Sequence, residues 1–90
     1  MLSDSEIEAV KEIDLVFVNI SSLKGIEYFI SLISLDLYSN ELEELDLSAN
    51  TDLRFLSCEY NKIVSLDLSA NTDLRFLSCA FNEISGLDLS

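Results

Sequence analysis

Apolar side chains recur along this chain with a long, fixed period. Residues 45–65 read LDLSANTDLRFLSCEYNKIVS, and residues 66–86 repeat them with only five changes. Self-similarity of this kind is the sequence signature of a solenoid. The spacing predicts coils over 10–31, 32–52 and 53–73 and a partial coil over 74–90. The equivalent anchors are Leu53, Leu56, Cys58, Asn61, Ile63 and Leu66; Leu74, Leu77, Cys79, Asn82, Ile84 and Leu87; Leu32, Leu35, Leu37, Asn40, Leu42 and Leu45; and Val10, Ile13, Leu15, Val18, Ile20 and Leu23.

Each coil contains a short stretch in which apolar and polar residues alternate, such as Leu56-Ser57-Cys58. This period of two predicts a strand, and stacked coils would pair their strands into a parallel sheet. The Asn column at Asn40, Asn61 and Asn82 is expected to hydrogen-bond the backbone where the chain turns out of the strand. The return half, 66–73, is too short and too rich in Asn, Ser and Thr for a helix. It is predicted to form extended segments and turns.

The N-terminal residues 1–9 predict a short capping helix. Ser3 and Glu6 have the spacing of a capping box, and acidic residues suit the positive end of a helix dipole. Ile7 and Val10 would share one face and lie over the first coil, because a solenoid end exposes core.

Composition narrows the function classes. The net charge of −12 disfavours nucleic acid and anionic membranes as partners, and no apolar stretch is long enough for membrane insertion. The chain has no His, and near-identical repeats offer no unique cleft for paired carboxylates. The chain is therefore predicted to be no enzyme, with no cofactor and no metal. The N-terminus lacks the pattern of a signal peptide.

The two cysteines, Cys58 and Cys79, lie one repeat apart and allow three interpretations. They could form a disulfide, bind a metal as a pair, or stay as buried thiols. Parallel Cβ vectors on neighbouring strands give poor disulfide geometry, and two thiolates alone do not make a zinc site. A stacked pair of buried free thiols, which behave as small hydrophobes, is the favoured interpretation.

The pattern LxxLxCxxNxIxxLDLSxNTx, at 53–73 and again from residue 74, resembles bacterial leucine-rich repeats. It is most similar to the cysteine-ladder kind of internalin-like surface proteins, over about residues 10–90. The resemblance implies a right-handed leucine-rich-repeat solenoid with a parallel sheet on one face. It also implies a non-catalytic protein-protein interaction module of a surface or secreted bacterial protein. Residues 2–6 are similar to the end of an EF-hand loop, so 1–9 is expected to be a remnant of such a segment and the chain to be truncated at both ends.

In this family the strand-lined face binds partners, which directs attention to the outward columns. These columns carry several aromatic residues that are expected to be largely exposed. An exposed aromatic patch suggests a binding surface, whereas simple stacking along the sheet or self-association would also produce the pattern. The predicted partner-binding residues are Tyr38, Phe55, Ser57, Glu59, Tyr60, Phe76, Ser78 and Phe81.

A second hypothesis treats the chain as a structural spacer without a ligand of its own. Its C-terminal repeat edge would expose core and an unpaired strand, and both favour self-association. On the return side, Asp46, Asp67 and Asp88 would form an acidic column. Carboxylates about 5 Å apart repel, so protonation or a cation would relieve them, although a solvated row without a role is the favoured interpretation.

Overall fold

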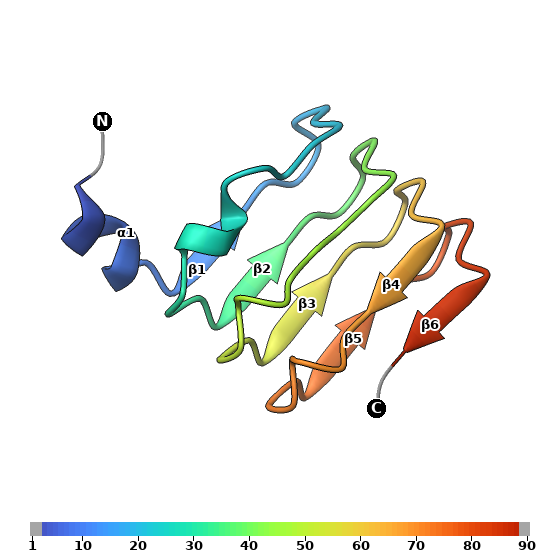
Figure 1. The fold of residues 1–90 in the computed structure, drawn as a ribbon. Helices are drawn as coiled ribbons and strands as arrows, with labels where there is room; N and C mark the ends of the chain where they lie inside the picture. Colours follow the sequence, from blue (N-terminus) through green and yellow to red (C-terminus); the bar gives the residue numbers. More distant parts are fainter. Residues whose placement is uncertain (1–2, 89–90) are drawn as a thin grey trace.

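The computed structural model describes the backbone of residues 3–88 and the side chains of residues 3–85. Four strands pair in parallel in the order β1-β2-β3-β5, and two more pair as β4-β6. Figure 1 shows the four-stranded sheet as one layer and the return segments as another, with α1 beyond β1 at the N-terminal end. The elements are α1 (Asp4–Ala9), β1 (Glu12–Asp14), η1 (Ile26–Tyr28), β2 (Ser34–Asp36), β3 (Phe55–Ser57), β4 (Ser65–Asp67), β5 (Phe76–Ser78) and β6 (Gly86–Asp88).

The pairing register of the four-stranded sheet follows the repeat. Leu35 lies opposite Leu56, and Leu56 lies opposite Leu77, so one inward row runs through the coils. The smallest dimension of the molecule is 18 Å, which fits two layers about 10 Å apart. The predicted solenoid with a parallel sheet on one face is therefore confirmed.

The core fills the space between the two layers, and its side chains are most completely buried in the middle coils. Leucines dominate it because each coil places its anchors at the same inward positions. Side chains with no exposed surface are Leu32, Leu35, Leu37, Leu42, Leu47, Leu53, Leu56, Cys58 and Ile63. Their equivalents in the first and last coils are only partly buried and pack against this cluster. Burial thus depends on having a neighbouring coil on both sides.

The predicted Asn column is a hydrogen-bonded ladder. The side chain of Asn61 accepts from the Leu42 N–H at 3.1 Å and donates to the carbonyls of Leu37 at 2.9 Å and Cys58 at 3.1 Å. Each amide therefore joins two consecutive coils at the turn that follows the strand. The same pattern recurs at Asn40 and Asn82.

A second Asn ladder lies on the return side and was not predicted. The Asn71 amide donates to the carbonyls of Leu47 at 3.0 Å and Asn50 at 2.9 Å. Asn50 makes the equivalent pair of bonds one coil earlier. Both side-chain oxygens are buried without a protein donor. The return side also contains the parallel pair β4-β6, so its extended segments are more regular than the sequence indicated.

The N-terminal helix begins as predicted. The Glu6 N–H donates to the Ser3 hydroxyl, and the Ser3 N–H donates to the Glu6 carboxylate at 3.0 Å, which completes the capping box. The bonds to Ser3 lower the pKa of Glu6. Ile7 is half-buried. The capping role of residues 1–9 and the limits of the coils stay predictions.

The first coil differs from the others on its return side because it alone, among residues 3–88, contains a 3-10 turn, η1. Gly25 precedes this turn at φ 106°, a left-handed conformation that glycine adopts without strain. Among the described residues, no helix is long and apolar enough to cross a membrane.

Candidate protein-binding face

Four aromatic rings form a continuous column along the turn that ends each strand. We call Phe17, Tyr38, Tyr60 and Phe81 the aromatic column. Consecutive ring centroids are 5.6, 5.2 and 4.4 Å apart. The first two contacts are edge-to-face, at 68° and 67°, and the last is a parallel stack at 5°. The column therefore crosses all four coils.

Three members of the aromatic column occupy a left-handed backbone conformation. The φ angles are 57° at Phe17, 58° at Tyr60 and 58° at Phe81, and Ser39 takes the same turn position at 59°. Residues with a side chain are disfavoured there, and Gly or Asn is tolerated best. In the coil that has Ser39 at this position, the ring comes from the preceding residue, Tyr38. Aromatic residues at a position that suits Gly or Asn indicate that the ring serves a purpose besides the turn.

A second aromatic pair lies at the other end of the same strands. Phe55 and Phe76 are paired in register between β3 and β5, with parallel rings 4.8 Å apart. Phe76 is 50% exposed, whereas Phe55 is half-buried. Stacking of this kind stabilises a sheet by roughly 0.2–1 kcal/mol per cross-strand pair.

The expected exposure of the face is only partly right. Tyr60 and Phe81 are 43% and 66% exposed, but Tyr38 is half-buried because rings pack against it from both neighbouring coils. Phe55 is half-buried as well, which corrects the expectation that it is largely exposed. Ser57 is only 7% exposed and offers little surface to a partner.

Phe17 and Val18 are not among the predicted partner-binding residues. Phe17 is 67% exposed, and Val18 is 47% exposed, which corrects the expectation that Val18 is an inward anchor of the first coil. Both extend the apolar surface to the first coil. The sequence does contain a signal for Phe17, because it holds the same turn position in its coil as Tyr60 and Phe81.

Carboxylates border the aromatic column on the strand side. The Tyr38 N–H donates to Asp36 Oδ1 at 3.2 Å, and the Val16 N–H donates to Asp14 Oδ1 at 3.3 Å. Glu59 is held by a hydrogen bond from the Ser78 hydroxyl. Burial, with smaller contributions from Tyr60 and Glu59, raises the pKa of Tyr38. The Tyr38 phenol therefore stays neutral at physiological pH.

The two cysteines are free thiols, as favoured from the sequence. Cys58 has no exposed surface, whereas Cys79 is half-buried because it lies in the last coil. Burial raises the pKa of Cys58 to about 12, with smaller contributions from Cys79 and Glu59. The inner thiol is therefore unreactive in the folded chain and acts as a packing group.

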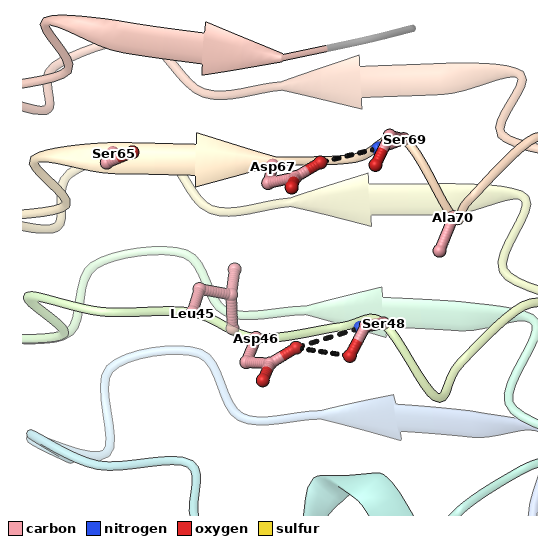
Figure 2. Close-up of a pocket in the computed structure, with 7 residues that line it drawn as sticks. All are labelled: Leu45, Asp46, Ser48, Ser65, Asp67, Ser69 and Ala70. Atoms are coloured by element: carbon pink, nitrogen blue, oxygen red, sulfur yellow. Dashed lines mark hydrogen bonds between the residues drawn. The ribbon is translucent and has the colours of Figure 1, made fainter.

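The return side carries a shallow hollow between two exposed aspartates. Figure 2 shows Asp46 and Asp67 on neighbouring coils, each bonded to the serine two residues later. The N–H and hydroxyl of Ser48 donate to Asp46 at 3.0 and 2.7 Å, and the Ser69 N–H donates to Asp67 at 2.9 Å. The bonds from Ser48 lower the pKa of Asp46. These carboxylates stabilise turns. The side chain of Asp88, the third member of the predicted acidic column, lies outside the described residues.

Comparison with known proteins identifies the fold. No family model matches the chain, and no curated protein matches it by sequence. The functional domain of InlJ from Listeria monocytogenes, which includes a cysteine ladder, superposes with a TM-score of 0.88 and 34% identity over 90% of this chain. The chain is an internalin-like leucine-rich-repeat protein. The internalin InlF from the same organism superposes with a TM-score of 0.83 and 26% identity over 99% of the chain.

The internalin-like chain is much shorter than these relatives. It spans 18% of the InlJ structure and 30% of the InlF structure. Its free Cys58 and Cys79 lie one repeat apart, and a cysteine ladder is named for InlJ.

Proposed function

We propose that this chain is a non-catalytic protein-interaction module that binds a partner through its strand-lined face. The observation that carries the proposal is that three exposed rings of the aromatic column lie at left-handed turn positions. Phe17, Tyr60 and Phe81 keep rings where Gly or Asn would relieve backbone strain. Aromatic side chains supply a large contact area at low entropic cost and are enriched among binding hot spots.

The other predicted residues support the aromatic column to different degrees. Phe76 adds an exposed ring, and Glu59 with Ser78 forms a fixed polar pair beside the column. Tyr38 and Phe55 act mainly by holding exposed neighbours in place, and Ser57 contributes through packing. By the family resemblance, the module belongs to a surface or secreted bacterial protein.

The proposal is tested by a differential binding experiment. The face variant Tyr60→Asn with Phe81→Asn removes two rings and keeps residues that tolerate a positive φ. The control variant Tyr28→Asn with Val64→Asn removes two apolar side chains that are 67% and 50% exposed elsewhere. Candidate partners captured by the wild-type chain are purified, and their Kd is measured with each protein.

The expected result is a purified partner whose affinity falls at least about tenfold on the face variant and stays unchanged on the control. Partners that bind both variants equally, or no partner that survives purification, would contradict the proposal.

A second candidate function, a spacer that associates through its C-terminal end, has its own supporting observation. Leu77, Cys79 and Ile84 are half-buried, whereas Leu56 and Cys58 at equivalent positions have no exposed surface. An edge of this kind is suited to a second copy. Light scattering after size-exclusion chromatography over a range of concentrations tests it. A dimer or larger species that grows with concentration supports the spacer, and a monomer throughout excludes it.

A further inference from the structure

The charges of the strand-lined face are separated along the strands. Asp14, Asp36 and Glu59 border the aromatic column at the carboxyl ends of the strands. On the other flank, the residues that follow the turn add Glu41 and Glu83, both exposed. Carboxylates therefore flank the aromatic column on both sides, although neither row is continuous. Ser57 and Ser78 continue the row of Asp36, and Lys62 lies between Glu41 and Glu83.

The cations of this face lie at the opposite ends of the strands. Lys11, Arg54 and Arg75 come directly before β1, β3 and β5. Arg54 is five residues from Glu59, about 16 Å along an extended strand. That separation is about twice the Debye length at physiological ionic strength, roughly 8 Å. Near the column, Lys62 is the one described cation that follows the turn, so the carboxylates there are poorly compensated.

The ring geometry decides which partner groups fit the aromatic column. Tyr60 and Phe81 cover each other's inner faces, because their planes differ by only 5° at 4.4 Å. Their edges and the second face of Phe81, which is 66% exposed, are therefore the main apolar surface open to a partner, together with the exposed Phe17 and Val18. Ring edges pack well against aliphatic and aromatic side chains. Three centroid steps of 5.6, 5.2 and 4.4 Å give a column that an extended segment of roughly four to five residues would cover.

We propose that the aromatic column binds a short extended segment of a partner protein in which apolar side chains are flanked by Lys or Arg. This inference rests on the proposed function and adds the chemistry of the partner. Apolar side chains pack on the ring edges, and the cations lie beside Asp36 and Glu59. Complementary charges of this kind mainly raise the association rate and suppress acidic partners.

The test uses a random library of displayed linear peptides, selected on the wild-type chain and then depleted on Tyr60→Asn with Phe81→Asn. The most enriched peptide is synthesised, and its Kd is measured at physiological salt. The charge variant Asp36→Asn with Glu59→Gln keeps an acceptor oxygen for each existing hydrogen bond. The matched control Glu43→Gln with Glu44→Gln removes the same charge from exposed positions off the face. Circular dichroism and urea unfolding verify that each variant is folded.

The expected peptides carry apolar residues next to Lys or Arg. Their affinity falls at least about tenfold on the ring variant and about threefold to tenfold on the charge variant, with no change on the control. Enriched peptides that are neutral or acidic, or that are equally weakened by the control, overturn the basic-partner inference while the proposed function stands. A library without enrichment overturns the extended-segment inference, whereas an affinity that survives the loss of both rings overturns the proposed function as well.

Discussion

Replacement of Asn61 by Ala tests the ladder that joins the coils. The substitution removes the acceptor of the Leu42 N–H and the donor to the Leu37 and Cys58 carbonyls. Asn61 is only 6% exposed and Leu42 is fully buried, so water does not replace the lost partner at the N–H. The matched substitution Asn82→Ala removes the same kinds of bonds in the last coil.

The expected magnitudes follow from burial. Each lost bond contributes about 1 kcal/mol, and a buried N–H without a partner costs about 1–3 kcal/mol. Asn61→Ala is therefore expected to lower the free energy of unfolding by about 3–5 kcal/mol, a large share of the roughly 5–13 kcal/mol typical of a domain of this size. Asn82 is half-buried, and its bonds with the Ile63 N–H and the Cys58 carbonyl are only partly buried, whereas the equivalent bonds of Asn61 are buried. Because water reaches the groups that Asn82 leaves, Asn82→Ala is expected to cost less, about 1–2 kcal/mol.

Urea unfolding followed by far-ultraviolet circular dichroism measures both variants. The slope of the transition verifies that the same surface is exposed in each protein. Equal losses for Asn61→Ala and Asn82→Ala would show that burial does not set the strength of the ladder. A loss below about 1 kcal/mol for Asn61→Ala would show that these bonds contribute little to the stability of the stacked coils.

Three further predictions concern side chains outside the ladder. Tyr60→Asn is expected to unfold at a higher urea concentration than Tyr60→Val, with a free energy of unfolding larger by about 1 kcal/mol, because a β-branched residue is strained at φ 58°; equal midpoints would refute this. A thiol reagent is expected to label Cys79 in the native chain and Cys58 only after unfolding, because burial raises the pKa of Cys58 to about 12; equal native rates would contradict it. Hydrogen bonds from Ser48 lower the pKa of Asp46, so their stabilisation is complete above the usual pKa and is lost as the pH falls through the lowered one. In Ser48→Ala, which lacks the hydroxyl donor, the pKa of Asp46 is expected to move back toward its usual range. A carboxyl titration by NMR measures this pKa, and an unchanged midpoint would exclude the Ser48 hydroxyl as the cause.

The register of the sheet was predictable because a repeat of constant length transmits its phase from coil to coil. Counting along the chain places Phe55 opposite Phe76 and Asp36 opposite Ser57, and both pairs are confirmed. The Asn column was predictable for the same reason, since a buried amide at every turn has an evident role.

The exposed fraction of each side chain on the strand-lined face was not predictable from its outward direction alone. Tyr38 points outward yet is half-buried, because rings from two neighbouring coils pack against it. The left-handed conformation of Tyr60 and Phe81 was also hidden, since their sequence context does not carry the Gly that usually marks such a position. Asn50 and Asn71 were counted as turn formers, although their amides bridge coils on the return side.

The proposed function requires that recognition takes place on the strand-lined face. The most direct measurement is an NMR titration of the isotope-labelled chain with the most enriched peptide from the selection. Amide shift changes are expected to concentrate at the aromatic column and at Glu59, with little change around Asp46 and Asp67 on the return side. Shift changes confined to the return side would contradict it.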